Sequence, residues 1–193
     1  MLIKKTRETF ETKIALELNI YGEGKHKIST GIKFFDHMLE QLSAHANMDL
    51  FLEANSLDGD NHHIVEDVAI VLGSALRESL GDKKGIKRYC DCILPMDEAL
   101  VLCAIDVSGR AYCKLDVQIK EERTSDFETV LLEHFFTTLA NNASLTLHIK
   151  MLDGKDPHHI IECTFKSFAH ALQGACEVNK KRANKIPSTK GVL

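Results

Sequence analysis

Two stretches of the 193-residue chain repeat each other, and this duplication limits the possible folds more than any other feature of the sequence. Residues 35–80 match residues 132–176 at an offset of 96 or 97 positions. The clearest match is the string HHIVE at residues 62–66, which returns as HHIIE at residues 158–162. Two copies are too few for a solenoid. The duplication therefore predicts two similar units related by pseudo-twofold symmetry.

Each unit is predicted to contain strands, a helix, a further strand and a second helix. Residues 13–20 alternate apolar and polar side chains as a half-buried strand does, and the apolar residues of 34–42 recur at helical spacing. The second helices are expected to begin at Asp60 and at Asp156, and Asp156 is a favourable N-cap residue. The second unit is expected to open with strands at 88–94, 99–107 and 111–119, separated by turns at 95–97 and 108–109.

This order of elements predicts an α+β fold of two pseudo-symmetric units, each a mixed sheet with two helices packed on one face. We expect the first unit at residues 1–87, the second at 88–179 and a basic C-terminal tail at 180–193. A chain of this size buries roughly 70% of its unfolded surface, so its core needs neither a metal nor a disulfide. The six cysteines include no C-x-x-C pair, and we expect them to be reduced.

The charge balance and the hydropathy pattern argue against two classes of partner. With 24 Lys and Arg against 28 Asp and Glu, the net charge is −4, which disfavours nucleic-acid binding through bulk charge. The apolar stretches are shorter than the roughly 20 residues of a membrane helix. The N-terminus shows no apolar signal core. We therefore expect a cytoplasmic protein that binds neither nucleic acid nor membranes.

The doubled H-H-x-x-E string predicts a metal centre. The chain's own composition would give such a string roughly 0.04 times by chance, so two copies in matching places are informative. Residues four apart share one face of a helix, so His62 with Glu66 can bind one ion and His158 with Glu162 another.

Four further histidines complete this hypothesis. His63 and His159 lie about 100° around their helices, and each is expected to reach the metal of the other motif. His37 and His134 occupy equivalent places on the preceding helices, one for each ion, and the acidic residue before each could orient its imidazole. Three imidazoles and one carboxylate leave open positions on a six-coordinate metal, which favours catalysis. Mn, Fe, Co, Ni and Zn all remain compatible with these ligands.

Candidate phosphate-binding residues lie where the two units differ and in the tail. Lys166 continues the face of the second motif, whereas the first unit has Ile70 in that place. His45 shares a helix face with His37, but its counterpart is Asn142, so we interpret His45 as a substrate contact or as support for a ligand. Guanidinium, hydroxyl and ammonium groups are the usual donors to phosphate. Outside the helices, the candidates of these types are Arg88, Arg110, Ser188, Thr189 and Lys190.

The strings FFDHMLEQLSAH, HHIVED, HHIIECTFK, DEAL, SGR and IPSTKG together resemble the imidazoleglycerol-phosphate dehydratase family over nearly the whole chain. The resemblance implies a ribosomal protein S5 domain 2-like fold. It also implies that the protein removes water from imidazole glycerol phosphate, giving imidazole acetol phosphate in histidine biosynthesis. Two Mn²⁺ ions per active site and a homo-oligomer of 24 subunits, with metal sites between chains, are further implications. Some relatives carry an N-terminal phosphatase domain, and we expect the monofunctional form.

The resemblance also assigns roles to individual residues. The family's metal ligands fall on His37, His62, His63, Glu66, His134, His158, His159 and Glu162. Its phosphate contacts fall on Gln41, Arg88, Arg110, Lys166, Ser188 and Lys190. An acidic substrate contact falls on Glu11. A carboxylate is expected to take the proton that the substrate loses, and Glu11, Glu66 and Glu162 all stay open as candidates.

Two alternatives to a dehydratase stay open from the residues. One is a dinuclear phosphoesterase that uses a metal-bound hydroxide and releases inorganic phosphate. The other is a non-enzymatic module for metal storage or RNA binding, whose RNA affinity would fall steeply with salt. Ile64 and His170 depart from the family pattern, which commonly has Thr and Arg there, but these departures concern local packing and not a ligand.

Overall fold

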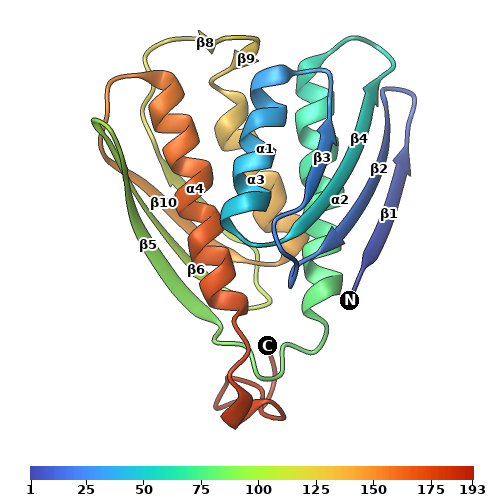
Figure 1. Ribbon diagram of the computed structural model, residues 1–193, viewed down its shortest axis with the longest axis vertical. Coiled ribbons are helices and arrows are strands. Elements are labelled where there is room, and N and C mark those ends of the chain that lie inside the picture. Colours follow the sequence, from blue (N-terminus) through green and yellow to red (C-terminus); the bar gives the residue numbers. More distant parts are fainter.

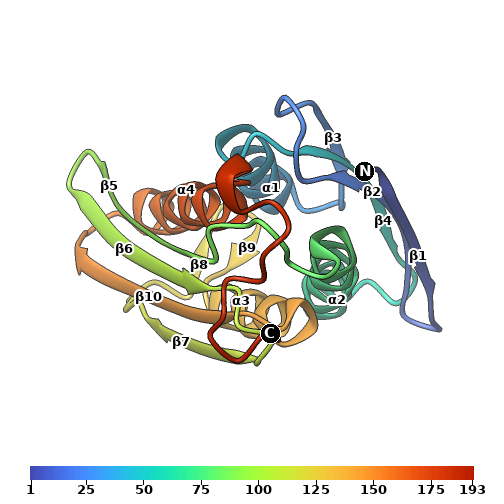
Figure 2. The same cartoon turned by 90° about the horizontal axis from the view of Figure 1, so that it is seen from below.

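Two four-stranded sheets form the outer layers of the molecule, and four helices lie between them (Figure 1 and Figure 2). The computed structural model describes residues 1–193, apart from the side chain of Arg182. The first unit consists of β1 (Ile3–Glu8), β2 (Thr12–Asn19), β3 (His26–Ser29), α1 (Lys33–His45), β4 (Asp49–Ser56) and α2 (Asn61–Leu80). Its sheet has the order β1-β2-β4-β3, with β3 parallel to β4 and the other pairs antiparallel.

The second unit repeats this arrangement. Its main elements are β5 (Tyr89–Met96), β6 (Ala99–Asp106), β7 (Tyr112–Asp116), α3 (Leu131–Ala143), β10 (Thr146–Asp153) and α4 (Pro157–Cys176). The sheet order is β5-β6-β10-β7, again with one parallel pair, β7 with β10. A small hairpin of β8 (Arg123–Thr124) and β9 (Phe127–Glu128) precedes α3, and a 3-10 turn, Lys180–Arg182, follows α4. The predicted α+β fold of two pseudo-symmetric units, with helices on one face of each mixed sheet, is confirmed.

The two units share one hydrophobic core. Helix α1 packs against α4 and α2 against α3, so each helix contacts a helix of the other unit as well as its own sheet. Phenylalanines fill the centre, where the Phe165 ring lies 5.3 Å from that of Phe135 and 5.0 Å from that of Phe136. Among the described residues, no helix is long and apolar enough to cross a membrane.

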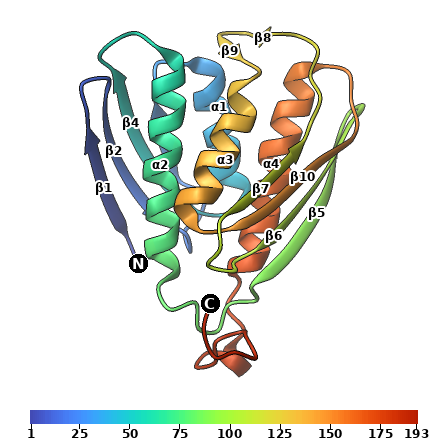
Figure 3. The same cartoon turned by 180° about the vertical axis from the view of Figure 1, so that it is seen from behind.

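All four helices begin at the same end of the molecule, the upper end in Figure 1 and Figure 3. Asp60 caps α2 by accepting a hydrogen bond from the backbone of His62 at 2.8 Å. Asp156 caps α4 by accepting hydrogen bonds from the backbone of His158 at 2.8 Å and of His159 at 3.3 Å. The predicted cap at Asp156 is confirmed, and Asp60 caps α2 in the same way. Both caps fix the first turn of their helix, where the paired histidines lie.

Some strands differ from the sequence prediction. Strand β1 was not predicted because only Ile3 of its six residues is buried. It is an edge strand whose charged residues are either exposed or paired with carboxylates of α2, as Lys5 is with Glu78 and Arg7 with Asp67. The turn predicted at residues 95–97 lies further on, because β5 continues through Pro95 to Met96 and turns at Asp97, where φ is +49°. Proline is tolerated here because β5 is also an edge strand.

We predict that Gly73→Ala destabilises the protein. A Cβ on Gly73 of α2 would lie 2.8 Å from both Cβ of Asn142 and the carbonyl oxygen of Leu139 on α3. We expect a loss of about 1–3 kcal/mol in the free energy of unfolding, typical of overpacking. Helix propensity alone predicts the opposite sign, a gain of up to about 1 kcal/mol. Denaturant unfolding at one protein concentration measures the change.

The matched control is Ser74→Ala, which changes the neighbouring, partly exposed position of the same helix. It should leave the free energy of unfolding within about 0.5 kcal/mol of wild type. An unchanged or raised stability of Gly73→Ala would show that α2 and α3 do not approach each other closely.

Candidate metal centre and phosphate pocket

Six of the eight predicted metal ligands gather in two clusters near the helix N-termini. The α1–α4 cluster contains His37, His158 and Glu162, and the α2–α3 cluster contains His62, Glu66 and His134. Within each cluster, one ligand atom from every residue lies within 4.8 Å of the others. Each cluster joins the H-H-x-x-E motif of one unit to the preceding-helix histidine of the other, so the packing of helices between units creates both.

Glu162 is the buried centre of the α1–α4 cluster. Its Oε2 atom lies 3.0 Å from His158 Nε2 and 3.5 Å from His37 Nε2. Its Oε1 atom accepts a hydrogen bond from Lys166 Nζ at 2.6 Å. Burial raises the pKa of Glu162, but the hydrogen bond and charge of Lys166, together with the two histidines, outweigh it and leave the pKa below its ordinary value. The lowered pKa favours the ionised form of Glu162, which is the buried member of a cluster whose two histidines are partly exposed.

The α2–α3 cluster holds an unsatisfied nitrogen. The rings of His62 and His134 stack with centroids 4.3 Å apart. The Nε2 atom of His134 is buried and has no hydrogen-bond partner among the described residues, since the nearest carboxylate oxygen, Glu66 Oε1, is 3.6 Å away. A buried polar atom without a partner is costly. A cation between these residues would satisfy it, so the donor set fits a metal ion.

The acidic residues before His37 and His134 do not orient the imidazoles as expected. Asp36 instead accepts hydrogen bonds from the backbone N of Thr30 at 2.7 Å and from its hydroxyl at 2.6 Å. Glu133 is exposed. The Asp36 carboxylate therefore holds Thr30 in the loop that leads into α1, and does not bond to His37.

His63 and His159 lie outside both clusters. His63 Nδ1 is 2.6 Å from Asp58 Oδ2, and His159 Nδ1 is 2.8 Å from Glu98 Oε2. Each hydrogen bond raises the pKa of its imidazole. Within one chain, neither histidine reaches the metal cluster of the other motif, contrary to the expectation from helix geometry. The pairing of His159 with Glu98 has no local sequence signal, because the two residues are 61 positions apart.

The hairpin tip that carries Glu11 is held against α2. Buried Asp67 accepts hydrogen bonds from Arg7 Nε at 2.7 Å and from the hydroxyl of Thr12. Thr12 is fully buried and follows Glu11 directly. Glu11 itself is exposed, with Oε1 3.8 Å from His63 Nε2, and it forms a third candidate group with His63 and Asp58.

Polar side chains continue from the α1–α4 cluster along the two helices. Gln41 and His45 follow His37 on α1 at four-residue spacing, and Lys166 follows Glu162 on α4. The His45 ring meets that of His170 with centroids 5.2 Å apart. Burial lowers the pKa of His45, and the charges of His170 and Lys166 lower it further. The substrate contacts predicted on helices thus lie on α1 and α4, the two helices that form the α1–α4 cluster.

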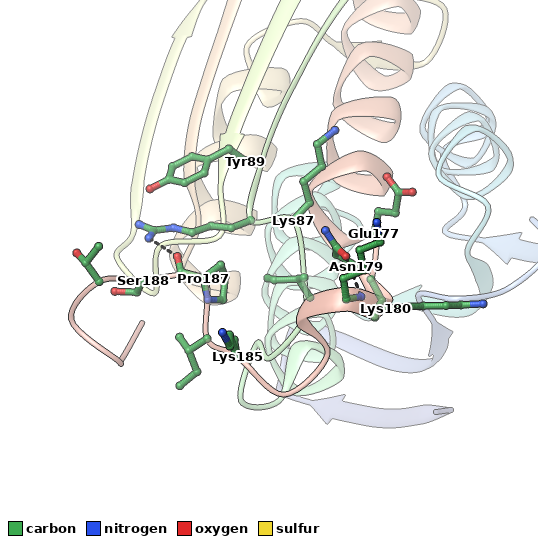
Figure 4. A pocket seen from close by; sticks show the side chains of 14 residues that line it. Lys87, Tyr89, Glu177, Asn179, Lys180, Lys185, Pro187 and Ser188 are labelled. Atoms are coloured by element: carbon green, nitrogen blue, oxygen red, sulfur yellow. Dashed lines mark hydrogen bonds between the residues drawn. The ribbon is translucent and has the colours of Figure 1, made fainter.

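The remaining predicted phosphate contacts lie at the other end of the molecule. The C-terminal tail and the start of β5 enclose a pocket of about 1190 Å³ (Figure 4). Arg88, Ser188 and Thr189 line it together with Lys180, Lys181 and Lys185. The Ser188 hydroxyl oxygen accepts a hydrogen bond from the backbone of Lys190 at 3.1 Å, and Arg110 is exposed in the turn after β6.

One chain does not bring these two sets of residues together. Arg88 donates its backbone N–H to Ala175 at the C-terminal end of α4, whereas His158 lies in the first turn. A helix of 20 residues is about 30 Å long. A small substrate cannot touch the clusters and the tail pocket of the same chain, so one set must come from elsewhere if both bind it.

Comparisons with known proteins agree on one family. The sequence model of imidazoleglycerol-phosphate dehydratase matches residues 30–172. The chain is 50% identical over 189 residues to the imidazoleglycerol-phosphate dehydratase of Dinoroseobacter shibae, covering 97% of both proteins. The crystal structure of the Staphylococcus aureus enzyme has a TM-score of 0.85 and 35% identity, covering 93% of this chain and 100% of that one. The Pyrococcus furiosus enzyme in complex with (S)-C348 has a TM-score of 0.84 and 38% identity, covering 98% and 100%.

We predict that Glu98→Gln lowers the pKa of His159 in the metal-free protein. The carboxylate stabilises the protonated imidazole, so a neutral amide should let the pKa fall from its raised value toward the ordinary value of about 6.5. NMR titration of histidine-labelled protein measures it. His63 is the internal control, because its partner Asp58 is unchanged. An unchanged His159 pKa, or equal shifts of both histidines, would contradict the observed pairing.

Proposed function

The chain belongs to the imidazoleglycerol-phosphate dehydratase family, and from that premise we propose that its two clusters hold the metal ions of the reaction and that its tail pocket binds the substrate phosphate. The enzyme is a hydro-lyase that removes water from imidazole glycerol phosphate in histidine biosynthesis. The single observation that carries the proposal is the pair of pseudo-symmetric His, His, Glu clusters.

The donors fit Mn²⁺, and we propose two such ions per active site. Imidazole and carboxylate ligands suit manganese, and each cluster supplies two imidazoles and one carboxylate. Glu162 is ionised and buried, and His134 Nε2 lacks a protein partner among the described residues. When bound, such ions supply positive charge that holds the substrate's imidazole ring and makes it a better electron sink.

Under this proposal, the residues that bind one substrate molecule come from more than one chain. His63 and His159 point to carboxylates outside the clusters of their own chain, and the tail pocket lies a helix length away. Neighbouring copies would supply the missing imidazoles and the phosphate donors. A homo-oligomer of 24 subunits, as the family resemblance implies, would provide such junctions. We propose residues 1–87 and 88–179 as the repeated units, 180–193 as the tail that completes the phosphate site, and a cytoplasmic enzyme.

Lys166 is proposed to connect the metal centre with the phosphate. Its ammonium bonds to Glu162 at 2.6 Å, and its side chain is 19% exposed. A cation one turn beyond the ligands can meet an anion bound next to the metal centre. Gln41 and His45 on α1 face the same helix pair, and Arg88, Arg110, Ser188, Thr189 and Lys190 of another chain would enclose the phosphate from the far side.

We assign the proton acceptor to Glu11. Glu66 and Glu162 belong to the clusters, and a carboxylate bound to a cation is a weak base. Glu98 takes the place of Glu11 in the second unit, directly before β6, but hydrogen bonds from the backbone of Asp156 and from His159 hold its pKa at about 2. Glu11 is exposed, and the one ion pair of its carboxylate among the described residues is the 3.8 Å contact of Oε1 with His63 Nε2. It is therefore the carboxylate left available for the C–H proton.

We predict different losses for the three carboxylates. Glu66→Gln and Glu162→Gln should lower manganese affinity by more than about 10-fold. Loss of a residue that merely hydrogen-bonds a metal ligand already costs about that much, and loss of a ligand itself should cost more. Glu11→Gln should keep both ions and lower kcat by about 10² to 10⁴-fold. Metal analysis of dialysed protein and a turnover assay with imidazole glycerol phosphate measure both.

Glu8→Gln is the matched control, an exposed carboxylate of the same hairpin that pairs only with exposed Lys13 among the described residues. It should retain metal and turnover. Full metal content in both Glu66→Gln and Glu162→Gln would contradict the assigned clusters, and full turnover of Glu11→Gln would contradict the assigned base.

We predict that two inactive variants complement each other. Glu162→Gln damages the α1–α4 cluster, and Arg88→Ala damages the tail pocket. In mixed assemblies of equal amounts, an intact cluster of one chain meets an intact tail pocket of another at roughly a quarter of the sites, so roughly a quarter of wild-type activity should return. Differently tagged chains purified together provide the sample. Two tagged copies of one variant serve as the control. No recovery in mixed assemblies would mean that each site is built within one chain.

A further inference from the structure

Asp106 lies at the end of β6 and holds the guanidinium of Arg88 from one side. Arg88 Nε donates to Asp106 Oδ1 at 2.7 Å, and Nη2 donates to Oδ2 at 3.2 Å. The side chains are 11% and 18% exposed. A bidentate pair fixes both the plane and the position of a guanidinium, which a single contact does not.

The same guanidinium holds the tail. Arg88 Nη1 donates to the carbonyl oxygen of Pro187 at 2.9 Å, the dashed contact to Pro187 in Figure 4. A guanidinium has five N–H donors. Three of them bond to Asp106 and Pro187 among the described residues, so two remain for a ligand in the pocket. Because Pro187 precedes Ser188, this contact also sets where the next phosphate donors begin.

The backbone of Arg88 is held in an unusual conformation. Its φ is +80°, in the left-handed region that non-glycine residues rarely adopt. Its N–H donates to Ala175 at 2.9 Å, and its carbonyl accepts from the N–H of Val107 at 3.0 Å. Backbone hydrogen bonds to α4 and to the residue after β6 therefore hold Arg88 in this strained conformation. Strained backbone held in this way is common at functional sites.

We propose that Asp106 is a positioning residue for phosphate binding, which orients Arg88 toward the phosphate and, through Arg88, fixes the tail at Pro187. This inference rests on the proposed phosphate contact of Arg88. Each oxygen of Asp106 accepts a hydrogen bond from Arg88, and its negative charge repels a phosphate, so we assign Asp106 to positioning and not to substrate contact. On charge alone, a carboxylate in a phosphate pocket weakens binding, whereas orientation of the guanidinium strengthens it.

The opposite signs of these two effects make Asp106→Asn the decisive variant. In the assembled, metal-loaded enzyme we expect KM for imidazole glycerol phosphate and the inhibition constant of inorganic phosphate to rise together by about tenfold, the loss of one charge-assisted hydrogen bond. The value of kcat should stay within about twofold, because the reacting carbon atoms lie at the metal centre. Asp91→Asn, an exposed carboxylate on β5, is the matched control and should change none of the three.

Two further variants separate the possible failures. Unchanged or tighter phosphate inhibition in Asp106→Asn, together with weak inhibition in Arg88→Ala, overturns the role of Asp106 and leaves that of Arg88. Unchanged phosphate inhibition in Arg88→Ala overturns the proposed function of Arg88. If Asp106→Asn does not assemble, Asp106→Glu decides: a raised KM at constant kcat supports the inference, and a wild-type KM overturns it.

Discussion

The packing of α1 against α4 and of α2 against α3 is the constraint on which the candidate site depends. A histidine of one unit meets the H-H-x-x-E motif of the other only because these helices are in contact across the shared core. Gly73 lets α2 and α3 approach closely, and buried Glu162 lies where α1 meets α4. The geometry of each cluster therefore depends on core packing, because a shift of either helix pair would move its histidine away from the other two residues.

The proposed parts of the dehydratase site lie far apart within one chain. The clusters lie at the N-terminal ends of the helices, and the tail pocket lies beyond their C-terminal ends. Such a separation makes association between chains a requirement of the proposed chemistry. His63 and His159 lie outside the α1–α4 and α2–α3 clusters of their own chain, and each pairs with a carboxylate instead.

Much of the fold followed from local pattern, and the errors lay where contacts are distant. The duplication predicted two equal sheets, and Asp60 and Asp156 predicted the starts of α2 and α4. Periodicity did not find β1, whose residues are mostly exposed. The sequence predicted six residues that do cluster, but not the partners of His159 or Arg88, because contacts over 61 and 18 residues leave no local signature.

Anomalous diffraction at the manganese edge from crystals of the metal-loaded protein tests the central claim most directly. The account predicts two strong peaks per chain, one bonded to Glu162, His37 and His158 and the other to Glu66, His62 and His134, each completed by a histidine of another copy. Peaks away from these residues, or a single peak bonded only to one chain's Glu11, Asp58 and His63, would contradict it.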